Sequence, residues 1–277
     1  GLPRPIEGCQ YLAVYFWERS MKKRVLSTFN EQGYYLARGL FSQCAISNLQ
    51  KEFDKIVNQM NASNENINAR WGSELTKTIE DPKSMVLHTH NVQSYSQKML
   101  NMVQNKHLLD VVERLIGPDI ILHHTKLFLK PPKVGSAFPL HQDWSYFPTQ
   151  SNSMIAAVVH LSKSKKSMGR IRLVRGSHKM GRIKGSDGHS YVKDIHGSHD
   201  LESAYAVDAD PGDVLFFHCC SLHGSKANES ENSRKTVLIQ LYSGKDKVED
   251  STHTNVQLTL RGWNHYATRS GVSGINV

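Results

Sequence analysis

Apolar residues recur at helical spacing in three stretches of the first half of the chain. Residues 18–32 are mostly polar, with apolar side chains three or four positions apart and Gly33 after them, which predicts an amphipathic helix. A second helix is predicted to begin after Ser42, whose side chain can cap it, and to end before the Asn- and Ser-rich segment 61–68. A third is predicted over residues 96–116, before a Gly-Pro pair. The apolar stripe of the second helix comprises Ile46, Leu49, Phe53, Ile56, Val57 and Met60.

Past residue 118 the pattern changes to short apolar runs separated by turn residues, which is typical of β-strands. A short strand at residues 34–38 precedes them, and the later runs cover residues 119–129, 154–161, 170–175, 203–208, 213–218 and 235–243. Helices followed by strands predict an α+β fold. We expect a single domain over residues 1–277, with a helix-rich part (1–118), a β-rich core (119–245) and a C-terminal segment (246–277).

The composition narrows the function classes. Hydrophobic residues make up 39% of the 277 residues and charged residues 21%, which excludes a collagen-like or wholly disordered chain. No stretch approaches the roughly 20 apolar residues of a membrane-spanning helix, so we expect no membrane span. The net charge of +9 permits nucleic acid, an anionic membrane or an acidic small molecule as partner. Because no helix-turn-helix, RNP-type motif or zinc finger accompanies the charge, we expect a small-molecule substrate and no nucleic acid. The oligomeric state is left open.

The cysteines and the chain ends bear on localisation. The four cysteines are Cys9, Cys44, Cys219 and Cys220, and none forms a CxxC pair. Cys219 and Cys220 lie in an apolar run, so as strand residues they would point to opposite faces. A disulfide framework is not expected, which favours a reducing, intracellular compartment. The first residues do not resemble a secretory signal, and the last three residues are not a peroxisomal address. We therefore expect a cytoplasmic protein and leave the peroxisome open.

Three residues have the spacing of a metal site. His141 and Asp143 are two positions apart, and in an extended chain such residues face the same side. His223, in a His-Gly-Ser sequence after the run 213–218, supplies a second imidazole. Two histidines and one carboxylate on one face of an ion suit non-haem Fe(II), because the other coordination positions stay open for a cosubstrate and dioxygen. His218 is the nearest competitor of His223, but it ends an apolar strand and is expected to be a core histidine.

A cationic residue follows the second histidine. Arg234 lies eleven residues past His223 and opens the apolar run 235–243. A guanidinium at the end of a strand can hold a carboxylate through two parallel hydrogen bonds. The far carboxylate of 2-oxoglutarate is the natural candidate, and Ser225 can donate a further hydrogen bond to it.

These motifs resemble the phytanoyl-CoA dioxygenase family of Fe(II)/2-oxoglutarate oxygenases. The resemblance runs from Phe29 to Tyr242 and is densest in Lys130-Pro-Pro, Pro139-Leu-His-Gln-Asp143, Tyr146-Phe-Pro, Gly176-Ser-His-Lys179, Gly212-Asp-Val-Leu-Phe-Phe-His218 and His223-Gly-Ser with Arg234. It implies a double-stranded β-helix (jelly roll, cupin-like) flanked by helices, with Fe(II), 2-oxoglutarate and O2 as cofactor and cosubstrates. It implies iron ligation by His141, Asp143 and His223, and 2-oxoglutarate contacts from Arg234 and Ser225.

The resemblance also bears on the reaction and on two further cosubstrate positions. It places Lys126 where another cosubstrate-lining residue lies, although a merely solvated strand lysine is an open alternative. Val159 stands where phytanoyl-CoA enzymes carry a bulky aromatic residue near the cosubstrate. Asp143 implies hydroxylation or another oxidation, because related halogenases replace this carboxylate with a small residue.

The substrate is less defined by the residues. Trp144 and Tyr146 are expected either to line the substrate mouth or to pack in the core. The stretch 163–184 contains nine Lys or Arg residues and no acid, and we expect Arg170, Arg172 or Arg175 to contact an anionic substrate group, such as a carboxylate or the phosphates of an acyl-CoA. The alternatives are an amino-acid or natural-product substrate, a catalytically inactive binding module, and a cupin-like metal enzyme without 2-oxoglutarate.

Overall fold

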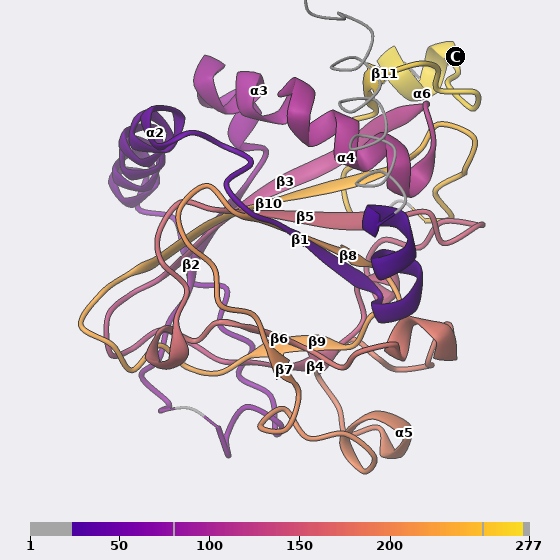
Figure 1. The fold of residues 1–277 in the computed structure, drawn as a ribbon. Helices are drawn as coiled ribbons and strands as arrows, with labels where there is room; N and C mark the ends of the chain where they lie inside the picture. Colours follow the sequence, from indigo (N-terminus) through magenta and orange to yellow (C-terminus); the bar gives the residue numbers. More distant parts are fainter. Residues whose placement is uncertain (1–23, 80, 251, 274–277) are drawn as a thin grey trace, which may run out of the picture.

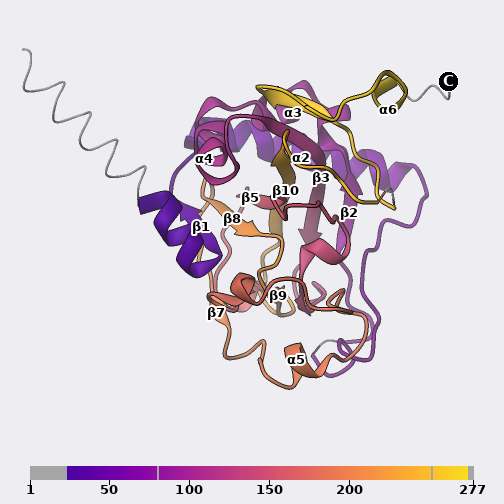
Figure 2. The ribbon, with the colours of Figure 1, turned by 90° about the vertical axis from the view of Figure 1, so that its right-hand side faces the viewer.

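Two antiparallel β-sheets face one another in the computed structural model, which describes residues 24–79, 81–250 and 252–273 (Figure 1). The larger sheet has seven strands in the order β1 (Tyr34–Ala37), β8 (Val214–His218), β5 (Ile155–His160), β10 (Arg234–Ser243), β3 (Ile120–Lys130) and β11 (Leu258–Arg261), with β2 (Leu87–His90) also paired to β3. The smaller sheet has the order β4 (Phe138–His141), β9 (His223–Ser225), β6 (Ile171–Leu173) and β7 (Tyr205–Ala206). Figure 2, turned by 90°, shows the same two layers from the side.

The two faces of the larger sheet are buried against different partners. Along β5, Ala157 and Val159 belong to the core that the sheet shares with the helices, whereas Ala156 and Val158 belong to the core between the two sheets. The division follows from the two-residue period of a strand, in which successive side chains point to opposite faces. A strand buried on both faces therefore contains a continuous apolar run, as residues 154–161 do.

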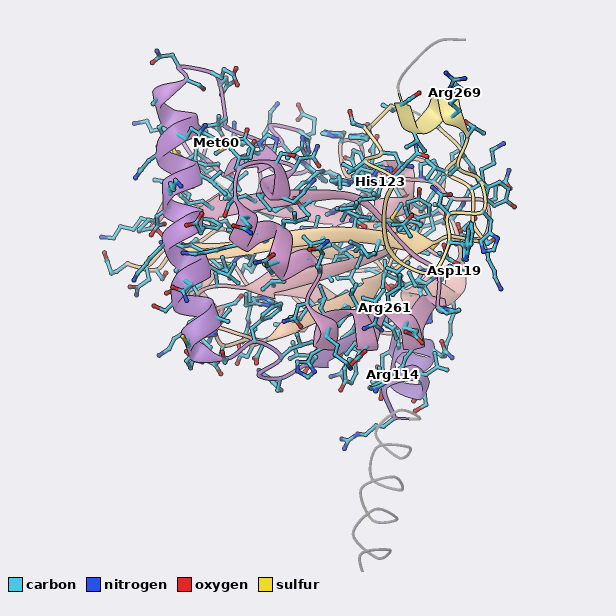
Figure 3. The ribbon with its side chains drawn as sticks, turned by 90° about the horizontal axis from the view of Figure 1, so that it is seen from above. Met60, Arg114, Asp119, His123, Arg261 and Arg269 are labelled. Atoms are coloured by element: carbon cyan, nitrogen blue, oxygen red, sulfur yellow. The ribbon has the colours of Figure 1, made fainter. Side chains whose placement is uncertain are left out.

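Helices cover the outer face of the larger sheet (Figures 1 and 3). They are α2 (Gln43–Ala62), α3 (Gln97–Val103) and α4 (Lys106–Ile116), whereas a helical segment over residues 24–32 lies beside the sheets, next to β1 and β8 (Figure 1). The side chain of Ser42 caps α2 by accepting a hydrogen bond from the backbone N–H of Ala45, and the predicted apolar stripe of this helix is buried. Gly33 follows the first helical segment with a φ of 80°, a left-handed conformation that glycine adopts without strain. The shorter helices are α5 (Lys193–His196), α6 (Arg269–Ser273) and the 3-10 turns η1 (Val92–Ser94), η2 (Asp143–Ser145), η3 (Lys166–Met168) and η4 (Ser177–Met180).

Most of the predicted elements are found, with several differences. The helix predicted over 96–116 is divided into α3 and α4, because the side chain of Asn105 accepts hydrogen bonds from two backbone N–H groups and starts a new helix. Cys219 and Cys220 lie in a turn after β8, so their predicted placement on opposite faces of a strand is wrong. Of the helix predicted over 18–32, residues 18–23 lie outside the described residues.

Strands were missed on both sides of the expected β-rich core. β2 comes from the part predicted as helix-rich and β11 comes from the C-terminal segment, whereas β1 matches the short strand predicted at residues 34–38. Arg261 at the end of β11 pairs with Asp110 and Glu113 of α4, with N–O distances of 2.8 Å to each carboxylate (Figure 3). The C-terminal segment is therefore held to both the sheet and its helical cover. No helix of the described ranges is long and apolar enough to cross a membrane.

Candidate functional site

Two histidines and one aspartate converge at one end of the smaller sheet. His141 ends β4 and is directly opposite His223, the first residue of the antiparallel partner β9. Asp143 opens the turn η2 two residues later. Its Oδ1 lies 3.3 Å from Nε2 of His223 and 3.9 Å from Nε2 of His141. The three ligand atoms lie within 4.8 Å of one another, so these side chains can hold a metal ion.

Backbone carbonyls orient both imidazoles. Nδ1 of His141 lies 2.8 Å from the carbonyl oxygen of Pro139, and Nδ1 of His223 lies 3.0 Å from that of Ser221. A carbonyl oxygen only accepts, so each Nδ1 carries the hydrogen and each Nε2 presents a lone pair to the cluster. Burial lowers the pKa of His141 to about 3, which keeps this imidazole neutral and able to ligate.

A glutamine orients the carboxylate. Nε2 of Gln240 in β10 donates a hydrogen bond of 2.7 Å to Oδ2 of Asp143, which leaves Oδ1 facing the histidines. Burial alone would raise the pKa of Asp143, but the neighbouring His223, His141 and Gln240 together hold it at about 2. The carboxylate is therefore ionised. Two imidazoles and one carboxylate form the donor set that suits non-haem Fe(II).

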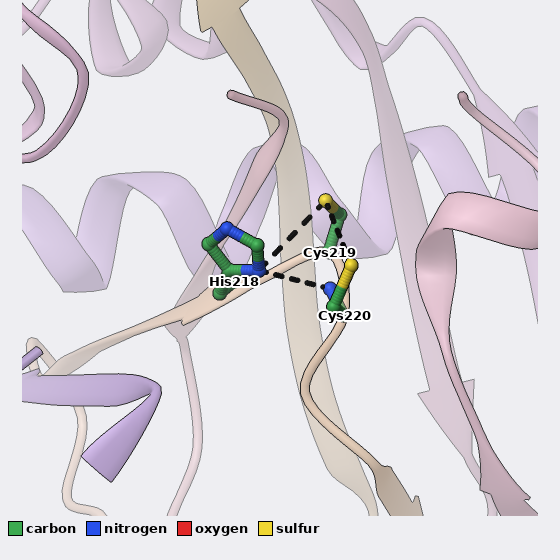
Figure 4. Close-up of side chains that lie close together, drawn as sticks. All are labelled: His218, Cys219 and Cys220. Atoms are coloured by element: carbon green, nitrogen blue, oxygen red, sulfur yellow. Dashed lines mark hydrogen bonds between the residues drawn. The ribbon is translucent and has the colours of Figure 1, made fainter. Parts of the chain in front are cut away.

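A second cluster of metal-ligating atoms lies on the turn after β8 (Figure 4). The Sγ atoms of Cys219 and Cys220 are 4.0 Å apart, and Nδ1 of His218 lies 3.9 Å from Sγ of Cys219. This Nδ1 accepts a hydrogen bond of 3.0 Å from the backbone N–H of Cys220, so its lone pair is already used. His218 thus does not belong to the cluster of His141, Asp143 and His223. It borders a second cavity and does not lie fully in the core.

His141, Asp143 and His223, called the triad below, line one end of a pocket. The other end of this pocket is cationic. Arg234 begins β10, is 4% exposed, and has a pKa that burial lowers to about 10, so it is charged at neutral pH. One guanidinium nitrogen donates to the carbonyl of Gly169, while its buried Nε has no partner among the described residues. Lys130, opposite Arg234 in β3, donates a hydrogen bond of 2.6 Å to Oγ of Ser225. A buried cation with an unused donor fits a carboxylate ligand.

One pocket of about 280 Å³ joins these two ends. The triad, Arg234 and Ser225 all line it. The remaining walls come from the inner faces of β3, β5, β6, β8 and β10, from β2 and from loops.

Comparison with known proteins decides the family. Residues 29–236 match the family model described as phytanoyl-CoA dioxygenase (PhyH), which is most of the chain. The chain belongs to the phytanoyl-CoA dioxygenase family.

Relatives of this family differ in what they act on. The peroxisomal phytanoyl-CoA dioxygenase of Bos taurus is 27% identical over 220 residues, which cover 76% of this chain and 65% of that protein. A probable alpha-ketoglutarate-dependent hypophosphite dioxygenase of Stutzerimonas stutzeri is 26% identical over 203 residues, covering 60% of this chain and 69% of that protein. The chain thus spans just under two thirds of the bovine protein's length.

Solved structures share the fold. The epimerase SnoN in complex with Fe3+, alpha ketoglutarate and nogalamycin RO superimposes with a TM-score of 0.70 and 17% identity, over 88% of this chain and all of that one. The predicted enzyme class, an Fe(II)/2-oxoglutarate-dependent dioxygenase, is confirmed for the family, as are its iron and 2-oxoglutarate.

Within this PhyH fold, two predicted cosubstrate residues have different outcomes. Lys126 of β3 lines the pocket. Val159 does not: it is fully buried on the helix-facing side of β5, and Val158 lines the pocket instead. The prediction for Val159 is wrong by one residue, which in a strand moves a side chain to the other face of the sheet.

Of the two alternatives predicted for Trp144 and Tyr146, lining the substrate mouth or packing in the core, each residue follows a different one. Tyr146 lines the pocket, and its hydroxyl donates a hydrogen bond of 2.6 Å to the carbonyl of Asp187. Trp144 lies outside the pocket lining, because its Nε1 donates a hydrogen bond of 2.6 Å to Oε1 of Gln142 and draws the indole away. Trp71 takes that place, with its ring 4.7 Å from that of His141. Sequence reasoning missed Trp71 because it lies in a loop without periodicity.

The three arginines expected at the substrate do not line the pocket. Arg172 lies in β6 and Arg170 directly precedes this strand, and Ile171 between them is the residue that lines the pocket. Arg170 pairs with the carboxylate of Asp208. Arg172 donates to the carbonyls of three residues in the loop 201–204. The expectation that these two contact substrate is wrong, because their donors are used by the protein itself.

Arg175 is likewise used within the protein. Its Nε donates a hydrogen bond of 3.2 Å to the hydroxyl of Tyr34, and its guanidinium lies 3.7 Å above the ring of Tyr205. The cations that line the pocket are instead Lys126 and Arg234, and Lys130 lies behind its wall, hydrogen-bonded to the lining residue Ser225. Lys130 was not singled out from the sequence, although a lysine within the apolar run 119–130 was a visible signal.

Proposed function

We propose that this chain is an active Fe(II)/2-oxoglutarate-dependent oxygenase that hydroxylates or otherwise oxidises an unactivated C–H bond of a small, anionic substrate. The observation that supports it is the placement of a two-histidine, one-carboxylate cluster and a buried guanidinium at the two ends of one pocket. In this proposal the two facing sheets form the double-stranded β-helix (jelly roll) of a single oxygenase domain.

Each residue at the metal end has a distinct task. His141, Asp143 and His223 would hold Fe(II), and their backbone and side-chain partners keep Nε2, Oδ1 and Nε2 aimed at the same point. Bound iron would supply the redox chemistry that couples decarboxylation of 2-oxoglutarate to oxidation of a C–H bond. The protein leaves the other side of the site open to the pocket, which is where cosubstrate and substrate must lie.

The cationic end would hold the far carboxylate of 2-oxoglutarate. Arg234 supplies the charge and the guanidinium donors. Because Oγ of Ser225 accepts from the ammonium of Lys130, the hydroxyl hydrogen of Ser225 is free to donate to that carboxylate. Lys130 is in this way a positioning residue for Ser225.

The pocket size favours a small substrate. Its volume of about 280 Å³ is at the low end of the roughly 300–1,000 Å³ range of ligand pockets, and 2-oxoglutarate must share it. An acyl-CoA would place only its reacting segment inside. A small acid, amino acid or natural-product intermediate fits the space better.

An intracellular location, cytoplasmic or peroxisomal, stays a prediction.

The test is an anaerobic titration of the protein with Fe(II) in the presence and absence of 2-oxoglutarate. We expect a weak visible charge-transfer band only when both are present. The variant His223→Ala should lose the band, and His218→Ala, from the second cluster, should retain it. Succinate release over a panel of small acids, amino acids and acyl-CoAs then identifies the substrate. A wild-type protein that develops no band would overturn the proposal in favour of an inactive binding module.

A further inference from the structure

Besides Arg234, a second cation lines the pocket, away from the proposed site of the far 2-oxoglutarate carboxylate (the cosubstrate clamp, formed by Arg234 and Ser225). Lys126 is opposite Leu238 of β10 and opposite His90 of β2. It is four residues from Lys130 along β3, a distance of about 13 Å in a strand. In β10, its partner Leu238 is two residues from Gln240, which binds Asp143. Lys126 therefore lies in the half of the pocket that contains His141, Asp143 and His223.

The ammonium of Lys126 has no hydrogen-bond or ion-pair partner among the residues that the structure describes. Its nearest defined neighbour is the ring of Phe147, whose centroid is 4.9 Å from Nζ. Burial lowers the pKa of Lys126, and the more distant Asp143 carboxylate only partly offsets this. Lys130, by contrast, donates to Ser225 and to the carbonyl of Lys226. The side chain of Lys126 is half-buried, and a partly desolvated cation without a counter-charge is disfavoured, so an anionic ligand would stabilise it.

Neutral imidazoles surround this lysine. His88, His90 and His253 line the same pocket. Burial and the charge of Lys126 lower the pKa of His90 to about 4, and burial also lowers the pKa of His88 and His253. Nδ1 of His88 and Nδ1 of His253 are buried without a hydrogen-bond partner in the described chain. A neutral imidazole has one N–H donor and one acceptor nitrogen, so these histidines add polar groups to the pocket without adding charge.

The net charge of the pocket with Fe(II) and 2-oxoglutarate bound indicates that an anionic group of the substrate is missing. Lys126 and Arg234 are the cations and Asp143 is the carboxylate among the described residues that line it. The two positive charges of Fe(II) are matched by the two negative charges of 2-oxoglutarate. Lys130, buried beside Arg234 and Ser225, adds a further positive charge at the cosubstrate end, so the loaded pocket keeps uncompensated positive charge at both ends. Near the metal the uncompensated cation is Lys126.

We propose that Lys126, with His90 and His253 beside it, binds a singly charged oxyanion group of the substrate, such as a carboxylate, and so places a neighbouring C–H bond at the metal. This rests on the proposed function and names its substrate class: small monoanionic acids. It also assigns to Lys126 the role that the sequence suggested for Arg170, Arg172 and Arg175.

Propionate is the probe for this subsite. In the anaerobic complex with Fe(II) and saturating 2-oxoglutarate the clamp at Arg234 is filled, so a second small acid near the iron binds either at the open metal position or at Lys126. The Lys126→Met variant separates these two cases. Paramagnetic broadening of the propionate proton signals measures that binding. We expect broadening by the wild-type complex, little broadening of uncharged propionamide, and at least about tenfold weaker propionate binding by Lys126→Met. The matched control Lys163→Met changes an exposed lysine and should behave as wild type.

The 2-oxoglutarate dependence of the charge-transfer band separates the outcomes. Lys126→Met should need the same 2-oxoglutarate concentration as wild type, within about twofold, and should unfold at the same or a higher temperature because it removes a partly buried charge. If the variant instead needs about tenfold more 2-oxoglutarate and binds propionate normally, Lys126 is a cosubstrate contact and the proposal is overturned. Equal broadening of propionate and propionamide by a wild-type complex that shows the band also overturns it, and leaves the proposed function intact.

Discussion

The side-chain amide of Gln240 donates a hydrogen bond of 2.7 Å to Oδ2 of Asp143, while Oδ1 of the same carboxylate lies 3.3 Å from Nε2 of His223. The two oxygens of one carboxylate thus have separate tasks, and β10 determines which of them faces the metal position. Gln240 is fully buried, and its Oε1 has no hydrogen-bond partner in the described chain.

We expect Gln240→Leu to weaken metal binding by about 10- to 100-fold, the usual effect of losing an outer partner of a ligand. The carboxylate would then be free to rotate and to present either oxygen. Titration with Fe(II) or Co(II) measures the change, and Gln150→Leu, at an exposed position, is the control. Unchanged metal affinity in Gln240→Leu would show that the hydrogen bond does not position the carboxylate.

Arg234→Met should weaken 2-oxoglutarate binding by about a hundredfold, because a buried charge-assisted contact to a carboxylate is lost. Fe(II) binding without 2-oxoglutarate should stay as in wild type, since Arg234 is at the other end of the pocket. The 2-oxoglutarate dependence of the charge-transfer band measures this. Arg269→Met, an exposed arginine, should have no effect. A normal dependence in Arg234→Met would remove this residue from the cosubstrate site.

Arg172→Ala should destabilise the fold by about 1–3 kcal/mol and leave substrate binding unchanged. Its guanidinium donates to the carbonyls of Leu201, Glu202 and Ala204, and the buried carbonyls among them would lose their donor. Urea denaturation gives the free energy of unfolding, and the Michaelis constant for the identified substrate gives the second readout. A raised Michaelis constant at unchanged stability would restore Arg172 as a substrate contact.

The protein should lose stability as the pH falls from about 6.5 to about 4. Burial, and then the charge of Arg234, lower the pKa of His160 to about 4, and this imidazole is 1% exposed. In that pH window the unfolded chain binds the proton and the folded chain does not, so the free energy of unfolding decreases by up to about 1.4 kcal/mol per pH unit. His160→Gln should lower this slope by up to one proton in urea denaturation at pH 5, 6 and 7, whereas the exposed His107→Gln should not. An unaltered slope in His160→Gln would mean that His160 is protonated in the folded state.

The spacing of chemistry-bearing residues was sufficient to nominate the metal cluster. His141 and Asp143 are close in the chain, and the His-Gly-Ser sequence marks His223. What joins them is the antiparallel pairing of β4 with β9, which puts His141 opposite His223. Both strands are short and carry polar residues, so neither shows a strand pattern, and only their ladder partners hold them extended.

The composition and periodicity of this chain by themselves determined its α+β class, its helical stripes and its long strands, because those elements are decided by apolar residues at fixed spacing. The tertiary structure alone decided which face of a strand meets the pocket. Val158 rather than Val159, Ile171 rather than Arg172, and Trp71 rather than Trp144 line it. A strand buried on both faces has no polar side to reveal its orientation, and a loop has no period at all. The residues that would select the substrate lie on strands buried on both faces and on loops. The packing of these elements therefore determines which residues line the pocket.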